Sequence, residues 1–238
     1  MRAYPLASTT WGEEEINAIH EVIQSGRFTM GGQVSTFEEE FAKYIGSKYA
    51  VMVNSGSSAN LALLAAARYQ SIPKLQPGDE VLVPAVSWST TFYPVSQLGC
   101  RLKFVDVNPN TLNIDVVKLL EAITPETKAI FVVNLLGNPA EWNLIKEIAQ
   151  RYNLILLEDN CESLGASING KKAGTFGLGG TFSTFFSHHI STMEGGLVVT
   201  DDESLFHTLK SIRAHGWTRD LPEINHVHNK TGSPWDDL

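Results

Sequence analysis

The sequence predicts an α/β protein of three layers, in which a mainly parallel sheet carries helices on both faces. Three observations lead to this fold class. Strands and helices alternate along the chain, the strands are short and almost wholly apolar, and the intervening helices are roughly ten residues long. Strands that are apolar throughout are typical of a parallel sheet covered on both sides. Ligands of such sheets bind beyond the carboxyl ends of the strands, so the residues that follow the strands are candidates for function.

Two helices are expected before the alternation begins. The first is predicted from apolar residues that recur at helical spacing and end before Gly26: Ile16, Ile19, Val22 and Ile23. Ser35 and Glu38 have the spacing of a capping box, which predicts that a second helix starts there. That helix is expected to bury one aromatic and aliphatic face: Phe37, Phe41, Tyr44 and Ile45.

The alternation itself runs from residue 49 to residue 216. Apolar runs predict strands at 49–53, 80–84, 101–107, 128–133, 154–157, 181–186 and 197–200. Helical periodicity predicts helices at 59–69, 90–99, 115–123, 141–152 and after residue 200. From Asp220 onward the sequence is polar and has no sustained period, so we expect an irregular tail.

Composition narrows the class of partner. The 238 residues are 43% hydrophobic and 18% charged, which is typical of a globular protein with one large core or two small ones. A net charge of -8 argues against binding to nucleic acid or to an anionic membrane surface. No apolar run near the start is long enough for a signal peptide or a membrane span, which predicts a cytoplasmic protein. Cys100 and Cys161 form no CxxC pair, so neither a disulfide framework nor a four-thiolate site is expected.

Polar residues gather after two of the predicted strands. Gly56, Ser57 and Ser58 in "NSGSSAN" open a helix, where free N–H groups and the helix dipole favour a phosphate, although such clusters are often simple helix caps. The segment "LILLEDNCES" carries Glu158, Asp159 and Glu162 past a strand end. A carboxylate there would keep a pyridine-type nitrogen protonated, or would merely cap a helix or face solvent.

An aromatic residue and a histidine pair complete the candidate site. Trp88 in "AVSWSTT" follows a strand and could stack on a flat ring, or could be a core residue. His188 and His189 lie in the connection between two strands, in "TFSTFFSHHISTMEGG". A metal site would need a third ligand at fixed spacing, which the sequence lacks. The glycines of "GTFGLGG" precede a strand rather than a helix, which argues against a dinucleotide fingerprint.

Together these segments resemble the sugar aminotransferase family (DegT/DnrJ/EryC1/StrS type) of fold-type-I pyridoxal phosphate enzymes, up to about Arg219. The family has a Ser-Gly phosphate loop, an aspartate followed three residues later by an amide or acid, and a "FSF...K....GEGG" segment. The resemblance implies the large domain of the aspartate aminotransferase-like fold. It also implies the cofactor contacts: the phosphate at Gly56, Ser57 and Ser183, the ring nitrogen at Asp159, the ring hydroxyl at Glu162 and the ring face at Trp88.

One position departs from the family pattern. The family lysine that binds the cofactor covalently stands six residues before the glutamate of "GEGG", and six residues before Glu194 this chain has His188. An imidazole cannot form a stable Schiff base, but with an ordinary pKa of about 6.5 it can shuttle protons. With a histidine at this position, the chain resembles the 3-dehydratase branch of the family. His188 is then the base that acts on a pyridoxamine phosphate cofactor. His215 is a candidate for the sugar end of the site, or a histidine placed by the helix dipole.

The resemblance also implies the reaction and its partners. The expected substrate is a nucleotide-linked 4-keto-6-deoxyhexose, GDP-4-keto-6-deoxymannose, which loses its C3 hydroxyl. L-glutamate is the expected amino donor, and a homodimer is the expected assembly. The pathway implied is deoxysugar synthesis of the colitose type, for lipopolysaccharide O-antigen. A sister enzyme holds an iron-sulfur cluster on cysteines after the "RAHGWTR" segment, but residues 217–238 contain no cysteine, so no cluster is expected here.

Two alternatives remain open at this point. One is an ordinary nucleotide-sugar aminotransferase whose lysine lies elsewhere, for which Lys171 and Lys172 are the nearest candidates. The other is an inactive, truncated protein with the cofactor fold, because family members continue into a smaller C-terminal domain. The expected organisation is a cofactor-binding large domain with its N-terminal arm over residues 1–219, and an irregular tail over 220–238, with the small domain absent from this chain.

Overall fold

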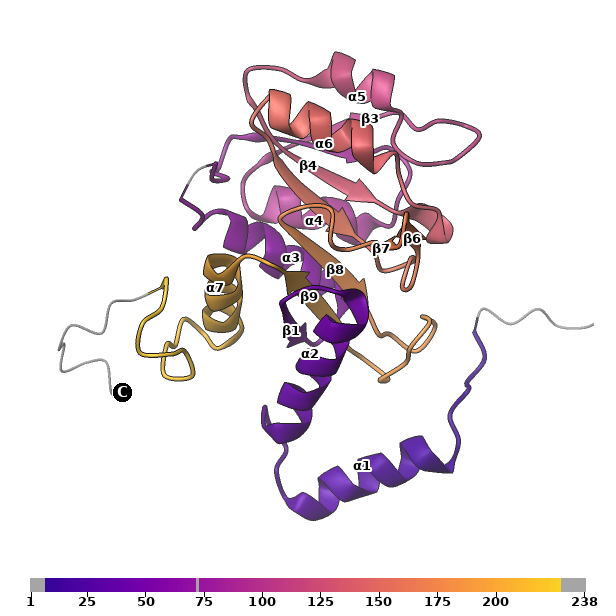
Figure 1. The fold of residues 1–238 in the computed structure, drawn as a ribbon, viewed down its shortest axis with the longest axis vertical. Helices are drawn as coiled ribbons and strands as arrows, with labels where there is room; N and C mark the ends of the chain where they lie inside the picture. The colour runs from indigo at the N-terminus through magenta and orange to yellow at the C-terminus, as the bar shows by residue number, and fades with distance from the viewer. Residues whose placement is uncertain (1–6, 72, 228–238) are drawn as a thin grey trace, which may run out of the picture.

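The computed structural model describes residues 7–71 and 73–227 and contains one large sheet between helices (Figure 1). The seven strands of that sheet are β1 (Tyr49–Val53), β2 (Glu80–Pro84), β3 (Arg101–Val105), β4 (Thr127–Val133), β5 (Ile155–Asp159), β8 (Gly179–Ser183) and β9 (Gly196–Thr200). The α-helices are α1 (Glu13–Ser25), α2 (Gly32–Ile45), α3 (Gly56–Ala67), α4 (Ser89–Gln97), α5 (Val116–Ala122), α6 (Trp142–Arg151) and α7 (Glu203–Arg213). A short 3-10 helix, η1 (Leu135–Gly137), follows β4, and β6 (Ser167–Ile168) pairs with β7 (Lys171–Lys172).

The sheet is mainly parallel, as the alternation predicts. Its strand order is β1-β9-β8-β5-β4-β2-β3. The pairs from β3 through β2, β4 and β5 to β8 are parallel. Strand β9 is antiparallel to both of its neighbours, β8 and β1. β8 and β9 are therefore a hairpin, and the segment between them leaves the sheet at the same edge as the carboxyl end of β5.

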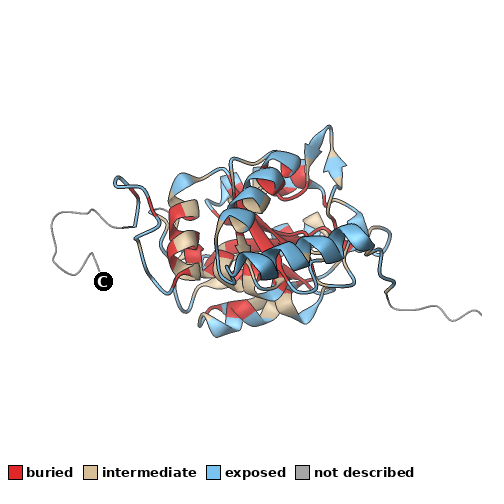
Figure 2. Ribbon diagram, turned by 90° about the horizontal axis from the view of Figure 1, so that it is seen from below, coloured by how far each residue is buried: buried red, intermediate tan, exposed pale blue. Residues whose placement is uncertain are grey.

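Helices cover both faces of the sheet because successive strand residues point in opposite directions. On β4, Phe131 belongs to an apolar cluster with α3, α4 and α7, whereas Ile130 belongs to a cluster with α5 and α6. A third cluster joins α2 to β1, β8 and β9. Figure 2 shows buried strands enclosed by helices, while α1 is exposed along its length and contributes no buried residue.

Two details of the predicted N-terminal helices are wrong. Helix α2 starts at Gly32 after an N-cap at Gly31, so Ser35 lies inside the helix and donates to Glu39 Oε1 at 3.2 Å. Glu38 does not cap the helix, because its carboxylate accepts from the backbone N–H of Met52 instead. Tyr44 is 51% exposed rather than buried. Its ring lies 3.5 Å from the ammonium of Lys172, a cation–π contact that holds it at the surface.

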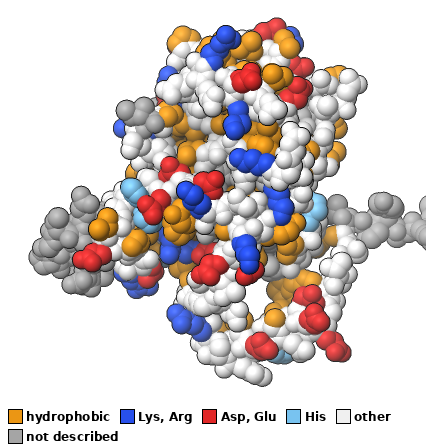
Figure 3. All heavy atoms as spheres, in the orientation of Figure 1, with side chains coloured by type: hydrophobic (Ala, Val, Ile, Leu, Met, Phe, Trp, Pro, Cys, Tyr) orange, Lys and Arg blue, Asp and Glu red, His pale blue; other side chains and the backbone are white. Residues whose placement is uncertain are grey.

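The other element predictions hold to within a few residues. The predicted strand at 181–186 ends at Ser183, because the chain turns there toward the hairpin connection. Residues 220–227 form neither helix nor strand, and the remainder of the predicted tail, 228–238, lies outside the described residues. None of the helices in the described ranges has the length and apolarity that a membrane span requires. Acidic and basic side chains are interspersed over the face drawn in Figure 3.

Candidate active site

Asp159 is the last residue of β5 and is 4% exposed. Its Oδ2 accepts two hydrogen bonds, from Asn60 Nδ2 at 2.8 Å and from Thr91 Oγ1 at 2.8 Å. Its Oδ1 accepts from the backbone N–H of Cys161 at 3.1 Å. Helices α3 and α4 supply the two side-chain donors, so the carboxylate at the strand end is held by groups from three segments of the chain.

Glu158 points away from this site, although it precedes Asp159 directly. It is completely buried on the other face of the sheet, where its carboxylate accepts from the backbone N–H groups of Gly174, Phe176 and Gly177. Burial raises the pKa of Glu158 to about 7, and the three N–H donors oppose that rise. Of the carboxylates grouped by the sequence analysis, Glu158 therefore belongs to the structural core.

The N-terminus of α3 faces the same edge of the sheet. Ser55 is the N-cap, and its Oγ accepts from Ser58 N at 3.1 Å. The remaining N–H groups of this turn, those of Gly56 and Ser57, are available to an anion. A Cβ on Gly56 would lie 2.7 Å from Ser183 Cβ and 2.8 Å from Cys161 Sγ. Only glycine permits this approach, which joins the predicted phosphate loop to the end of β8.

The predicted base lies between β8 and β9. Ser183 and Gly196 are paired across the hairpin, and the connection between them carries His188. Partial burial lowers the pKa of His188, and the adjacent His189 lowers it further. The backbone of Cys161 and the charges of Glu162 and Asp159 act in the opposite direction. These interactions place the imidazole beside the segment that carries Asp159, as a base that is mainly neutral at pH 7.

The other predicted site residues differ in their contacts and in their exposure. Glu162 accepts from Leu136 N at 3.0 Å, which ties it to η1. Ser57 is exposed on the first turn of α3, and Trp88 is the N-cap of α4 with 72% of its surface exposed. His215 stands apart from them. It follows α7, its ring lies 5.9 Å from that of Trp217, and within the described ranges it contacts no other predicted site residue.

The two residues that hold Asp159 were not predicted from the sequence. Asn60 is fully buried, and its position between Ala59 and the apolar run 61–67 of α3 was an available signal. Thr91 lies within the quoted "AVSWSTT" segment but has no spacing that links it to Asp159. Its Oγ1 also lies 2.9 Å from Ser87 Oγ, so a hydroxyl in the β2–α4 connection contacts the Thr91 hydroxyl that holds Asp159.

The two lysines considered for an alternative chemistry lie elsewhere. Both belong to β7, in the small second sheet. Lys172 donates to the carbonyl of Tyr44, and the ammonium of Lys171 lies 5.4 Å from the ring centroid of Phe176. Neither contacts Asp159 among the interactions found. In the part of the chain that the structure describes, no group of three histidine, cysteine or acidic side chains is placed to hold a metal ion.

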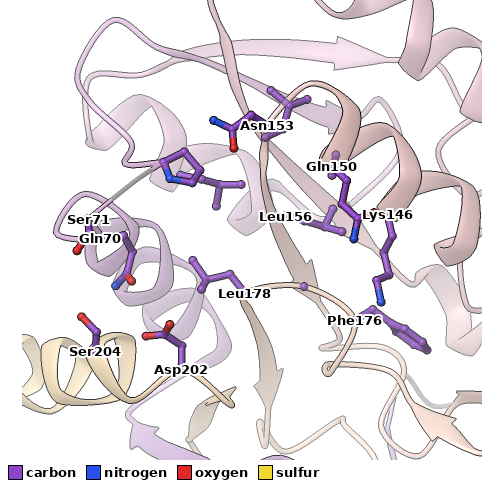
Figure 4. A pocket seen from close by; sticks show the side chains of 15 residues that line it. Gln70, Ser71, Lys146, Gln150, Asn153, Leu156, Phe176, Leu178, Asp202 and Ser204 are labelled. Carbon is purple, nitrogen blue, oxygen red and sulfur yellow. The ribbon is translucent and has the colours of Figure 1, made fainter.

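A separate pocket of about 490 Å³ lies at the opposite edge of the sheet (Figure 4). It is lined by Ile155, the first residue of β5, whereas Asp159 is the last. Gln150 and Lys146 of α6 face it from one side, and Asp202 and Ser204 at the start of α7 from another. This pocket is therefore distinct from the cluster around Asp159 and contributes nothing to it.

The arrangement around Asp159 can hold an anionic, flat ligand. The first turn of α3 and Ser183 suit a phosphate, Asp159 suits a protonated ring nitrogen, and His188 can take a proton from a carbon held between them. The chemistry of this set of donors and acceptors fits pyridoxal phosphate and its amine form. An exposed aromatic ring, Trp88, lies at the same edge of the sheet.

The comparisons with known proteins agree with this description. Residues 9–233 match the DegT/DnrJ/EryC1/StrS aminotransferase family. GDP-4-keto-6-deoxy-D-mannose 3-dehydratase of Yersinia pseudotuberculosis is 60% identical over 224 residues, which are 94% of this chain and 57% of that protein. GDP-perosamine synthase of Caulobacter vibrioides is 39% identical over 79% of this chain and 49% of its own length.

Solved structures show the same relationship. GDP-4-keto-6-deoxymannose-3-dehydratase with a trapped PLP-glutamate geminal diamine has a TM-score of 0.91 at 60% identity, and the match covers 94% of this chain and 58% of that one. The aminotransferase PseC of Helicobacter pylori has a TM-score of 0.84 at 30% identity, with 90% and 57% covered. The chain thus spans between 49% and 58% of the length of these relatives. From its sequence and its fold, the chain belongs to the DegT/DnrJ/EryC1/StrS aminotransferase family.

Proposed function

We propose that the chain provides the cofactor-binding part of a nucleotide-sugar 3-dehydratase that depends on pyridoxamine phosphate. The proposed reaction removes the C3 hydroxyl from a nucleotide-linked 4-keto-6-deoxyhexose, GDP-4-keto-6-deoxymannose. The observation that carries the proposal is the imidazole of His188 beside the Asp159–Glu162 segment, where aminotransferases of the family hold a lysine. The 60% identity to GDP-4-keto-6-deoxy-D-mannose 3-dehydratase supports the choice of substrate.

Residues 1–219 would form the cofactor-binding domain. Gly56, Ser57 and Ser183 would hold the phosphate, and Asp159 the ring nitrogen. Glu162 would accept from the ring hydroxyl, and Trp88 would stack on the ring. When bound, the cofactor supplies an electron sink next to the sugar carbon that loses its substituent.

The histidine performs the proton transfers. His188, neutral because partial burial lowers its pKa, would take a proton from the cofactor's methylene carbon and return it to the departing C3 hydroxyl. Asp159 would keep the ring nitrogen protonated throughout. L-glutamate would restore the amine form between turnovers, and the assembly would be a cytoplasmic homodimer. His215 remains a proposal for the sugar end of the site.

The test compares the two adjacent histidines. We expect His188→Asn to lower the dehydration rate by about 100-fold or more, because general base catalysis is typically worth that much. His189→Asn, which changes the exposed neighbour, should leave the rate within about twofold. Release of the dideoxy sugar measures both. Equal rates for His188→Asn and the wild type would refute the proposed role.

A second experiment separates dehydration from transamination. Borohydride should leave no cofactor attached to the protein, because only a cofactor linked to a lysine would be reduced onto the chain. His188→Lys should become susceptible to this trapping and should form amino sugar in place of dideoxy sugar. Trapping on Lys171 or Lys172 of the unaltered chain would favour the aminotransferase alternative instead.

A further inference from the structure

We infer that Asn60 is a positioning residue that acts through Asp159, an inference that rests on the proposed function. Asn60 lies one turn after Gly56 on α3 and has no exposed surface. A buried amide that is followed along the helix only by alanine and leucine, residues 61–67, is costly unless all its groups are bonded. The question is therefore what its hydrogen bonds hold in place.

The orientation of the amide is fixed by its partners. Asn60 Nδ2 donates to Asp159 Oδ2 at 2.8 Å and to the carbonyl oxygen of Thr90 at 3.1 Å. A carbonyl oxygen only accepts, so the nitrogen must face this side. Asn60 Oδ1 accepts from Thr181 Oγ1 at 2.5 Å. The amide thus joins α3, the first turn of α4, β5 and β8.

These bonds determine which oxygen of Asp159 meets a ligand. A carboxylate oxygen has about two acceptor positions. On Oδ2, Asn60 and Thr91 occupy both. Oδ1 accepts from the N–H of Cys161 at 3.1 Å, and the thiol of Cys161 also hydrogen-bonds the Asp159 carboxylate. Because Asn60 and Thr91 take both acceptor positions of Oδ2, an N–H of the bound ring must approach Oδ1.

Asn60 also sets the distance between the two ends of the site. The proposed phosphate contacts, Gly56 and Ser57, lie one turn before it on the same helix. Its partner Thr181 lies two residues before Ser183 on β8. A single buried side chain therefore connects the phosphate end of the site to the nitrogen end. An apolar residue of the same size could fill the space but could not make these bonds.

The experiment reads the protonation of the ring nitrogen directly. Pyridoxamine phosphate labelled with ¹⁵N in the ring is added to the chain, and the ¹⁵N chemical shift reports whether the nitrogen carries a proton. In Asn60→Leu the shift should move toward the unprotonated value, and the cofactor should bind about tenfold more weakly. Thr91→Val, which preserves shape, should move the shift in the same direction by less.

Thr127→Val is the matched control. Thr127 is also buried and donates to a carboxylate, Glu80 Oε1, at 2.7 Å, but it lies at the start of β4 on the opposite edge of the sheet. The Thr127→Val variant should lose stability as Thr91→Val does, and it should leave the ¹⁵N shift of the ring nitrogen unchanged. If Asn60→Leu does not fold, Thr91→Val carries the test.

The outcomes distinguish the inference from the function on which it rests. If the unaltered chain takes up no cofactor, the proposed function fails and the inference fails with it. If the chain binds the cofactor with a protonated ring, and neither Asn60→Leu nor Thr91→Val moves the shift beyond Thr127→Val, the inference alone is overturned.

Discussion

At the scale of single residues, the proposed function depends most on the half-buried imidazole of His188. Partial burial, the largest effect, lowers the pKa of His188 from its ordinary value of 6.5. The neutral imidazole therefore prevails at pH 7, and protonation removes the base as the pH falls below the pKa of His188.

We expect the dehydration rate to decline on acidification through the lowered pKa of His188. An NMR titration of the imidazole should give an apparent pKa below 6.5. His188→Asn identifies the signal by its disappearance. A midpoint above 6.5 for that signal would contradict the expected burial of the ring.

The buried carboxyl group of Glu158 leads to a prediction about how stability depends on pH. The folded chain holds the Glu158 proton up to about pH 7, whereas the unfolded chain releases it near the ordinary value of 4.5. Between these values the folded state binds more protons, so the contribution of Glu158 to the free energy of unfolding should fall as the pH rises, and level off above about pH 7.

Urea unfolding at a series of pH values measures this slope. Glu158→Gln should remove that part of the slope. It should also lower stability by about 1–3 kcal/mol at the acidic end, because an amide places N–H groups against the backbone donors of 174–177. An unchanged slope in Glu158→Gln would assign the pH dependence to other groups.

At the scale of elements, a partly buried ion pair connects α2 to α7. Arg213 pairs with Glu38 and also donates to the carbonyl of Met52 at 3.0 Å, and the two charged side chains are only 15% and 13% exposed. Arg213→Met should therefore lower the free energy of unfolding by about 1–3 kcal/mol, because the partly buried carboxylate of Glu38 would lose its ion-pair partner. Lys118→Met breaks the exposed Lys118–Glu121 pair and should cost at most about 1 kcal/mol. Similar losses in the free energy of unfolding for both variants, measured with urea, would refute the larger contribution of the Arg213–Glu38 pair.

Strand β9 approaches the predicted phosphate loop closely. A Cβ on Gly196 would lie 2.3 Å from the carbonyl oxygen of Ser55 and 2.6 Å from Gly56 N. Gly196→Ala should displace this loop and weaken cofactor binding by about tenfold, since overpacking typically costs about 1–3 kcal/mol. Gly32→Ala, at a helical position with nothing within 4 Å, should bind the cofactor normally. Fluorescence titration with pyridoxal phosphate measures both, and normal binding by Gly196→Ala would contradict the expected displacement.

The sequence was sufficient for features that depend on local pattern. Apolar runs and helical periodicity predicted every strand of the main sheet, and the strand ends predicted the position of Asp159. Features that depend on distant partners were missed. Ser35 and Glu38 have capping spacing, but Glu38 binds the backbone of Met52 and the guanidinium of Arg213, which only the folded chain brings near. Asn60 and Thr91 lie 99 and 68 residues from Asp159, so no spacing rule connects them.

At the scale of the whole molecule, apolar side chains remain exposed at the edge that carries the site. Trp88 is 72% exposed after β2, Leu136 is 73% exposed after β4, and Phe186 is 49% exposed after β8. Exposed apolar groups gathered at one edge favour association, in agreement with the proposed homodimer.

Sedimentation at micromolar concentration tests the assembly. The unaltered chain should sediment as a dimer, and Leu136→Asp should shift it toward the monomer. Leu120→Asp, which adds the same charge at a residue 41% exposed on α5, should not. A chain that is monomeric at all concentrations, or a dimer unaffected by Leu136→Asp, would exclude this edge as the interface.

The hairpin between β8 and β9 has an evolutionary consequence. The proposed base, His188, lies in a connection whose two ends are held by the Ser183–Gly196 pair and by the bond from Thr184 N to Gly195 O at 2.9 Å. A substitution at His188 would exchange the proposed base while these pairs continue to hold β8 and β9 together. Descendants of one ancestral scaffold can therefore acquire elimination or amination chemistry without solving the folding problem again.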